Sequence, residues 1–262
     1  TKDDLTMPYG TITNSTSTTN SALTKAVTIN TLHKFKGTGE KFVVISLYDA
    51  HMAAMAQRCG VEVVLVGDSL GMTVLGYDST IPVTMEHMIY HVEAVARGNK
   101  KSLIMGDLPF MTYATPEDAL RNCARIMQAG AHMVKLEGGE WLAETVRMLS
   151  DRGIPVCAHI GLTPQSVNKF GGFRVQGRDQ TQADKLLADA KLLAEAGADL
   201  LLMECMPAAL AAQITREIPI PTIGIGAGRD TDAQVLVIND ILGLTEQPPK
   251  FSKNFLLETN DI

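Results

Sequence analysis

The stretch HMVKLEGGEWLAETVRMLSDRGIPVCAHI, residues 132–160, decides the fold because it contains one complete strand–helix–strand unit. Its apolar ends, residues 132–137 and 154–160, predict buried strands. The segment between them, residues 140–151, carries apolar residues at three-to-four spacing, which predicts a helix that stops before Gly153. A helical crossover between two such strands is typical of a parallel sheet.

The same alternation continues along the chain from about residue 28. Eight apolar runs predict strands at residues 42–47, 61–67, 102–108, 132–137, 154–160, 199–206, 221–225 and 235–241. Segments with helical spacing lie between them, among them residues 84–97, 116–128, 140–151, 182–196 and 207–217. Residues 28–36 predict one more helix before the first strand. Eight strands with helical crossovers favour a closed (β/α)₈ TIM barrel, and an open doubly wound sheet is the alternative.

Length and composition fit one catalytic domain. The chain has 262 residues, of which 45% are hydrophobic, so it can bury a full core. We expect a single barrel domain over residues 30–262. Residues 1–29 are rich in Thr, Ser and Asn without an apolar period, which predicts a flexible N-terminal arm.

Charge and hydropathy argue against several classes of partner. A formal net charge of −6 with scattered Lys and Arg is unlike a nucleic-acid-binding surface. No apolar run reaches the roughly 20 residues that span a bilayer, and the N-terminus lacks the order of a secretory signal. The four cysteines have no metal-ligand spacing and predict buried, reduced thiols. We therefore expect a soluble, cytoplasmic protein that binds neither nucleic acid nor membrane.

Acidic residues follow three neighbouring predicted strands, at the barrel end where such enzymes place their catalytic groups. They are Asp68, Asp107 and Glu137. Three carboxylates in a partly dry cavity repel one another unless a cation lies between them. Because oxygen-only ligands suit Mg²⁺, the sequence predicts one Mg²⁺ per subunit at these acids. Taken singly, each acid could instead cap a turn or helix or brace a loop.

Three further residues face the same predicted barrel mouth. Lys135 lies two residues before Glu137, so strand alternation places both on one side. Glu204 ends an otherwise apolar run, where desolvation would raise its pKa towards neutrality, as suits a general base. His159 offers an imidazole at the same rim. The alternatives are a Glu204 paired with a core cation and a purely structural His159.

Other patterns are less specific. His87 and His91 lie one helical turn apart without a third ligand, so metal binding there is not expected. The glycines of residues 224–228 follow the seventh strand and favour a tight turn over a phosphate-binding loop. Residues 171–177 contain glycine hinges in a long loop at the active face, which predicts a lid.

Five strings in the chain resemble the ketopantoate hydroxymethyltransferase family, and the resemblance extends from about residue 28 to Ile262. They are VGDSLGMT (66–73), DLPFM (107–111), MVKLEGGE (133–140), HIGLTPQS (159–166) and FGGFRVQG (170–177). The resemblance implies a barrel of the phosphoenolpyruvate/pyruvate-like superfamily, assembled as a homo-oligomer, usually a decamer. It also implies transfer of a hydroxymethyl group from 5,10-methylenetetrahydrofolate to 3-methyl-2-oxobutanoate, giving 2-dehydropantoate and tetrahydrofolate, in pantothenate and coenzyme A synthesis.

Carried over position by position, the resemblance implies a role for each residue of the predicted site. The Mg²⁺ ligands fall on Asp68, Asp107 and Glu137. The contacts to the oxo acid fall on Asp68, Ser69, Asp107 and Lys135, to which His159 is added as a hydrogen-bond donor. The base falls on Glu204. Mg²⁺ would make the C3 proton of the oxo acid removable and stabilise the enolate that attacks the folate methylene carbon.

The chain departs from the family pattern at both ends. Family members continue past the position of Ile262 into a helical tail, and the short members have no counterpart of the N-terminal arm. Two other functions remain as alternatives: a lyase or phosphonomutase of the same superfamily, and a non-catalytic scaffold barrel. The lyase would need a catalytic thiol or a basic phosphate site near the lid, and the sequence suggests neither. A scaffold would not need the three acids, which are intact.

Overall fold

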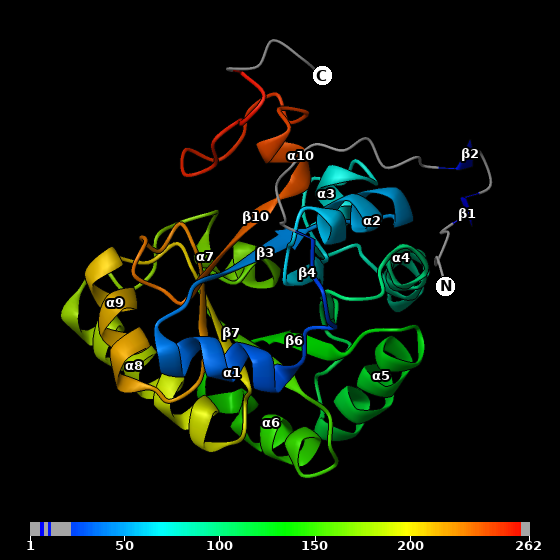
Figure 1. Ribbon diagram of the computed structural model, residues 1–262. Coiled ribbons are helices and arrows are strands. Elements are labelled where there is room, and N and C mark those ends of the chain that lie inside the picture. The colour runs from blue at the N-terminus through cyan, green and yellow to red at the C-terminus, as the bar shows by residue number, and fades with distance from the viewer. Residues whose placement is uncertain (1–5, 8–9, 12–21, 258–262) are drawn as a thin grey trace.

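The computed structural model describes residues 6–7, 10–11 and 22–257. Within them, eight parallel strands close into a barrel in the order β10, β3, β4, β5, β6, β7, β8, β9 (Figure 1). The strands are β3 (Phe42–Ser46), β4 (Val63–Val66), β5 (Leu103–Asp107), β6 (Met133–Glu137), β7 (Val156–Gly161), β8 (Leu200–Glu204), β9 (Thr222–Ile225) and β10 (Ala233–Val237). The last strand, β10, pairs with both β9 and β3. The predicted TIM barrel is therefore confirmed, and the open sheet is excluded.

Helices surround the barrel and connect its strands. They are α1 (Ile29–Thr38), α2 (Ala50–Arg58), α3 (Leu70–Thr73), α4 (Met85–Gly98), α5 (Pro116–Gln128), η1 (Glu140–Leu142), α6 (Ala143–Ser150), η2 (Pro164–Ser166), α7 (Val167–Phe170), α8 (Gln180–Glu195), α9 (Ala208–Glu217) and α10 (Ile238–Ile241). The prediction for α5 is correct at both ends, because Thr115 caps the helix and Pro116 occupies its first turn. None of the helices in the described ranges is long and apolar enough to cross a membrane.

The prediction for the last strand is wrong at both ends. The run 235–241 contains the last three residues of β10 and the whole of a short helix, since β10 begins at Ala233 and α10 follows it directly. Ile238 and Ile241 of α10 extend the apolar residues of β10 along the chain, although Asn239 and Asp240 lie between them, and Ile238 is only 6% exposed. Composition alone does not distinguish the two.

The part of the barrel interior that is lined by the amino-terminal ends of the strands is apolar, and α1 closes it. Inward-facing side chains form one buried cluster: Phe42, Val44, Val63, Leu65, Leu103, Met105, Met133, Cys157, Leu200, Leu202, Ile223, Ala233 and Val235. Leu32 of α1 is fully buried against this cluster, and Phe35 packs beside it. Thr28 starts the helix, because its hydroxyl accepts from the backbone N–H of Thr31 at 3.3 Å. In Figure 1, α1 lies at the end of the barrel opposite α10.

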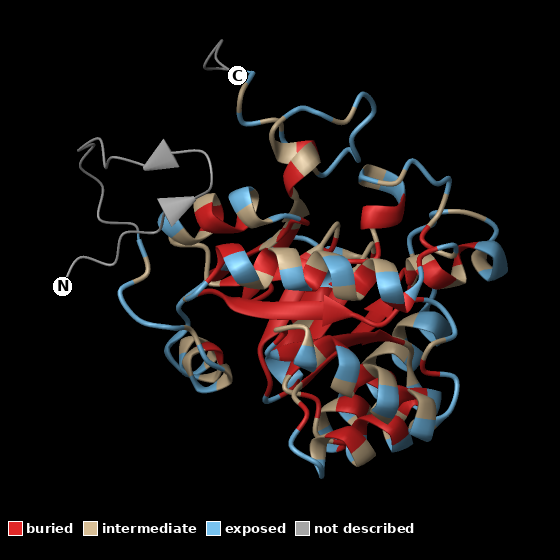
Figure 2. Cartoon of the chain, turned by 90° about the vertical axis from the view of Figure 1, so that its right-hand side faces the viewer, coloured by how far each residue is buried: buried red, intermediate tan, exposed pale blue. Residues whose placement is uncertain are grey.

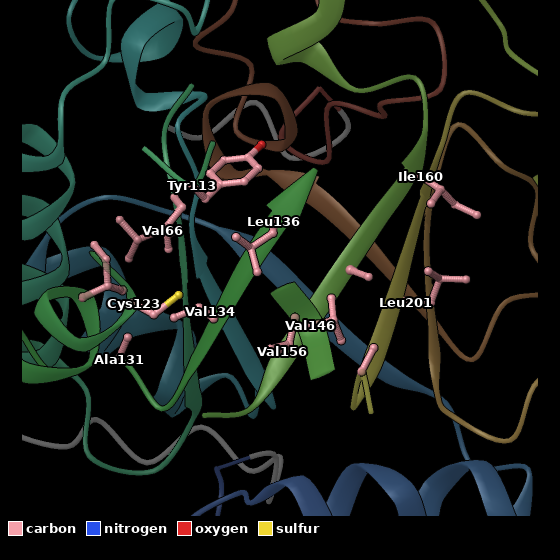
Figure 3. Close-up of a cluster of buried hydrophobic side chains, with 14 of the residues drawn as sticks. Val66, Tyr113, Cys123, Ala131, Val134, Leu136, Val146, Val156, Ile160 and Leu201 are labelled. Carbon is pink, nitrogen blue, oxygen red and sulfur yellow. The ribbon is translucent and has the colours of Figure 1, made fainter. Parts of the chain in front are cut away.

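A second core separates the strands from the surrounding helices. It includes Val134 and Leu136 of β6, Cys123 of α5 and Val146 of α6, all drawn in Figure 3. Figure 2 shows the pattern that results, with buried strands inside and helices that bury one face and expose the other. Each fully buried aliphatic side chain contributes roughly 1.5–3 kcal/mol. These two cores hold the strand ends rigidly in place.

Part of the predicted N-terminal arm contacts the barrel. The backbone N–H of Val27 donates to the carbonyl of Lys101 at 2.7 Å, and Lys101 Nζ donates to the carbonyl of Leu23 at 2.7 Å. Nearer the N-terminus, β1 (Thr6–Met7) pairs antiparallel with β2 (Gly10–Thr11). The rest of the predicted flexible arm, at residues 1–5, 8–9 and 12–21, lies outside the described residues.

The α1 helix should contribute to stability through one buried leucine. Leu32→Ala should lower the free energy of unfolding by about 2–5 kcal/mol, because it opens a cavity at the closed end of the barrel. Lys34→Ala, on the exposed side of the same helix, should change it by less than about 0.5 kcal/mol. Urea denaturation followed by circular dichroism measures both. Equal effects would mean that α1 does not close the core.

Candidate active site

The barrel interior changes from apolar to polar at the carboxyl ends of its strands. On β5, Asp107 follows Leu103 and Met105 on the inward side, and on β7 His159 follows Cys157 in the same way. The inward polar residues at these strand ends are Ser46, Asp107, Lys135, Glu137, His159 and Glu204. Strand alternation therefore places these polar side chains in the barrel interior, next to the apolar cluster on the carboxyl-terminal side.

These side chains line one cavity of about 700 Å³ at the mouth of the barrel. Asp68 and Ser69, in the turn after β4, line the same cavity. The structure thus brings together all the residues predicted for the site: Asp68, Ser69, Asp107, Lys135, Glu137, His159 and Glu204. They come from β5, β6, β7, β8 and the turn after β4, as expected for a barrel enzyme.

Lys135 is the cation of the cluster. Its Nζ lies 2.8 Å from Asp107 Oδ1 and 3.6 Å from Glu137 Oε1, and all three side chains are buried. Burial lowers the pKa of Lys135, but Asp107, Glu137 and Asp68 outweigh it and raise the pKa above the usual range. Lys135 therefore stays charged and faces three acids.

The three acids differ in how easily they ionise. Burial raises the pKa of Asp68 well above its usual value, and the charges of Asp107 and Glu137 raise it further. Burial also raises the pKa of Asp107, although Lys135 opposes the shift. Burial acts in the same direction on Glu137, but Lys135 and His159 lower its pKa more. An added cation beside Asp68 and Asp107 would relieve the repulsion that remains there.

His159 lies between two carboxylates. Its Nδ1 is 3.3 Å from Glu137 Oε1, and its Nε2 is 3.3 Å from Glu204 Oε2. Burial and Lys135 lower the pKa of His159, but the two carboxylates outweigh them and raise it to about 9. The Glu204 side chain is 16% exposed, whereas those of Asp107 and Glu137 are 3% exposed. Glu204 is therefore the more accessible acid, at the edge of the cluster.

Two polar residues of the site were missed by the sequence analysis. The Gln165 side chain donates to Asp68 Oδ2 at 2.8 Å, and the Tyr113 hydroxyl donates to Gln165 Oε1 at 2.5 Å. Gln165 lies within the string 159–166, but nothing in the string predicts that its amide reaches Asp68. For Tyr113, no signal in the sequence marks the contact.

Ser69 is held by a third residue that the sequence analysis did not single out. The Tyr48 hydroxyl lies 2.9 Å from Ser69 Oγ and accepts from Ser46 Oγ at 3.3 Å. Burial raises the pKa of Tyr48, so the phenol stays protonated. The Ser69 hydroxyl is thereby oriented at the cavity wall.

The outer part of the cavity is apolar and includes the predicted lid. Its lining there includes Met72, Phe173, Leu244 and Phe251. Phe173 lies in the loop 171–177 and is 56% exposed. The backbone N–H of Gln176 donates to the carbonyl of Cys205 at 2.9 Å, which ties the end of this loop to the barrel.

The glycine turn after β9 supports the same rim. Gly226 has φ 59°, and a Cβ at this position would lie 2.9 Å from Phe251 Cδ1. Only glycine allows this close approach without a shift. The turn at Gly226 therefore leaves room for the Phe251 ring to pack against its backbone. This agrees with the tight turn that the sequence favours.

His87 and His91 are not among the residues that line the cavity, whereas Cys205 is. His87 Nδ1 accepts from the backbone N–H of Thr84, and His91 Nδ1 lies 2.7 Å from the carbonyl of Tyr48. The cysteines do not pair: Cys123 and Cys157 are buried, Cys205 is half-buried and Cys59 is exposed. The prediction of a buried thiol is wrong for Cys59, which directly follows α2.

The acids do not converge on a single point. In the part of the chain that the structure describes, no group of three or more Asp, Glu, His or Cys side chains is arranged to hold one ion. Other groups already engage both oxygens of Glu137: Lys135, His159 and the backbone N–H of Gln165. Asp68 and Asp107 are adjacent, since the backbone N–H of Asp68 donates to Asp107 Oδ2 at 3.0 Å.

The barrel resembles solved structures at low sequence identity. A putative phosphonomutase from Burkholderia cenocepacia has a TM-score of 0.65 at 19% identity, over 84% of this chain and 96% of that one. A 2,3-dimethylmalate lyase of the PEP mutase/isocitrate lyase superfamily has a TM-score of 0.60 at 15% identity, over 84% and 83% of the two chains. These likenesses support the barrel fold.

Sequence relatives identify the family. Residues 26–262 match the profile of ketopantoate hydroxymethyltransferase. A 3-methyl-2-oxobutanoate hydroxymethyltransferase from Saccharophagus degradans is 74% identical over 240 residues, which cover 92% of this chain and 89% of the relative. An enzyme of the same name from Marinobacter nauticus is 58% identical over 238 residues, which cover 90% of each chain. The chain is therefore an enzyme that belongs to the ketopantoate hydroxymethyltransferase family.

Proposed function

We propose that the enzyme transfers a hydroxymethyl group from 5,10-methylenetetrahydrofolate to C3 of 3-methyl-2-oxobutanoate. The products are 2-dehydropantoate and tetrahydrofolate, with uptake of one water molecule, and the reaction would be the first committed step of pantothenate synthesis. The observation that carries this proposal is the cavity in which Lys135, Glu204 and three further carboxylates meet. The names of the relatives support the same oxo acid.

The oxo acid would bind at the polar end of the cavity. Lys135 supplies a buried positive charge for the substrate carboxylate, and it is held in place by Asp107 at 2.8 Å. The Ser69 hydroxyl, held by Tyr48 at 2.9 Å, would donate a second hydrogen bond. Such an arrangement selects a small anion that also carries a carbonyl oxygen.

The donor set fits a divalent cation beside Asp68 and Asp107. Both carboxylates line the cavity, and Mg²⁺ is usually held by one or two carboxylates together with water and substrate oxygens. Direct ligation by any of the three acids stays a prediction, because other groups engage both oxygens of Glu137 and both oxygens of Asp107. When bound, Mg²⁺ would draw charge from the 2-oxo and carboxylate oxygens and make the C3 hydrogen more acidic.

Glu204 would remove the C3 proton. It ends β8 at the cavity wall, and His159 Nε2 lies 3.3 Å from its carboxylate. The proton would pass from C3 to a Glu204 oxygen, and the electron pair left at C3 would form the new bond to the folate methylene carbon as one of its two C–N bonds breaks. A water oxygen would replace the second C–N bond, and the two folate nitrogens would take up the proton from C3 and one proton from that water. The product hydroxyl oxygen comes from water.

The folate would occupy the outer, apolar part of the cavity. A volume of about 700 Å³ is typical of pockets for larger ligands and exceeds what a five-carbon oxo acid requires. Phe173 offers an exposed aromatic face beside this space. A flat pterin ring would stack on such a face, and the loop 171–177 would exclude water from the reacting carbon.

One experiment tests the proposed function directly. The enzyme is incubated with Mg²⁺ and 3-methyl-2-oxobutanoate, with and without 5,10-methylenetetrahydrofolate, and the products are identified by mass spectrometry. We expect 2-dehydropantoate only in the presence of the folate. Cleavage of the oxo acid, or no product in either reaction, would contradict the proposal.

Replacement of Lys135 should affect one substrate selectively. Lys135→Met should raise KM for the oxo acid roughly 10- to 100-fold, since a hydrogen bond to a charged group contributes about 1.5–3 kcal/mol. KM for the folate should change little, because Lys135 is buried on β6 whereas Phe173 lies in the exposed loop 171–177. Steady-state kinetics with each substrate varied in turn measure both constants. Equal losses for the two substrates would show that Lys135 is misassigned.

Glu204→Gln should separate binding from proton transfer. The variant keeps the size of the side chain but loses the base, so it should bind the oxo acid almost normally. Deuterium exchange at C3 and hydroxymethyl transfer should fall together, roughly 100-fold or more. NMR of the substrate methine signal in deuterated buffer measures the exchange. A variant that exchanges at the wild-type rate but does not transfer would move Glu204 to the folate half of the reaction.

Phe173→Ala should weaken folate binding alone. We expect KM for the folate to rise roughly 2- to 10-fold, because an aromatic contact contributes about 0.5–1.5 kcal/mol beyond its buried area. C3 exchange measured without folate should stay unchanged. Val175→Ala, in the same loop and 37% exposed, is the matched control. A loss of folate-free exchange in Phe173→Ala would argue against a separate folate subsite.

A further inference from the structure

We propose that Gln165 is a positioning residue that fixes the carboxylates of Asp68 and Glu137 for binding of the oxo acid and its cation. The residue lies in η2, after β7, and is 5% exposed. The role in substrate binding rests on the proposed function, whereas the role in holding the two acids does not.

Gln165 connects the ends of three strands through four hydrogen bonds. Its Nε2 donates to Asp68 Oδ2 at 2.8 Å and to the carbonyl of Leu108 at 2.9 Å. Its backbone N–H donates to Glu137 Oε2 at 3.0 Å. Its Oε1 accepts from the Tyr113 hydroxyl at 2.5 Å. Both amide hydrogens and the amide oxygen are thereby used, as a buried amide requires.

The surroundings allow only one orientation of the amide. A flipped amide would place its oxygen against the Asp68 carboxylate and the Leu108 carbonyl, which both need a donor. The Tyr113 hydroxyl accepts from the backbone N–H of Glu137 at 3.3 Å, and its own hydrogen has two acceptors, Gln165 Oε1 at 2.5 Å and the carbonyl of Glu137 at 3.2 Å, of which Gln165 is the nearer. The ring of Tyr113 stacks on Trp141 at 6.1 Å and 10° between planes. Tyr113 therefore fixes Gln165, and Gln165 fixes the acids.

Gln165 contacts the two acids through different groups: its side-chain amide donates to Asp68, and its backbone N–H donates to Glu137. Asp68 gains a donor that favours its ionised form, which burial and its acidic neighbours oppose. Glu137 has Oε2 tied to the backbone of Gln165, so Oε1 is the atom that faces Lys135 and His159. A glutamate at position 165 would add a further carboxylate beside Asp68 in place of the donor. A neutral amide supplies the two donors that Asp68 and Leu108 need and the acceptor that the Tyr113 hydroxyl needs.

Gln165→Met keeps most of the side-chain volume and removes the donors to Asp68 and Leu108. We expect KM for the oxo acid, and the Kd of Mn²⁺ measured by calorimetry in the presence of the oxo acid, each to rise roughly 10- to 100-fold. The value of kcat should fall less. Tyr113→Phe removes only the hydroxyl that orients the amide and keeps the ring beside Trp141, so both constants should rise by a smaller factor. Gln180→Met, the same change at an exposed position of α8, should leave them unchanged.

KM for the oxo acid and Kd of Mn²⁺ distinguish a positioning role of Gln165 from a role in fold stability alone. If Gln165 only supported the fold, its loss would lower kcat in proportion to the folded fraction and leave KM and Kd unchanged, and that result would overturn the proposal. If Gln165→Met does not fold, Tyr113→Phe tests the proposal through the same two constants. A crystal structure of either variant with the Asp68 carboxylate unmoved would also overturn it. That readout stands even if the wild-type enzyme does not act on the oxo acid, which would contradict only the proposed function.

Discussion

The ion pairs of Lys135 with its neighbouring acids are the constraint on which the site depends. Three buried carboxylates, Asp68, Asp107 and Glu137, share one buried ammonium group, whose Nζ lies 2.8 Å from Asp107. Removing such charges from water costs several kcal/mol per ion, and mutual attraction offsets this only when the geometry is held closely. The cluster therefore needs rigid surroundings and leaves negative charge that a divalent cation would neutralise.

The barrel provides rigid surroundings for the cluster, because the apolar core at one end of its strands fixes the polar residues at the other end. The apolar half of the interior, closed by Leu32 of α1, fixes the strands below the site. Alternation along β6 then directs Met133 into that core and both Lys135 and Glu137 into the cavity. Local strand geometry thus brings opposite charges together, and the loops after the strands add Gln165 and Phe173.

The elements and residues predictable from the sequence are those that a local pattern encodes. Eight strands follow from their apolar runs, and Asp107 and Glu204 from their places at strand ends. Gln165 is 97 residues from its partner Asp68, and no local pattern records such a contact. The short helix α10 was missed because one turn is too short for a helical period. The decameric assembly that the resemblance implies and the cytoplasmic location expected from the sequence stay predictions.

The most direct test of the account is hydrogen exchange at C3 of 3-methyl-2-oxobutanoate by the wild-type enzyme in deuterated water, without folate. If the acid cluster and a bound cation activate the oxo acid before any carbon is transferred, exchange should occur with Mg²⁺, stop after a chelator is added and resume when excess Mg²⁺ is restored. The NMR signal of the methine group reports each stage. Exchange that persists in the chelator, or that never occurs without folate, would contradict the account.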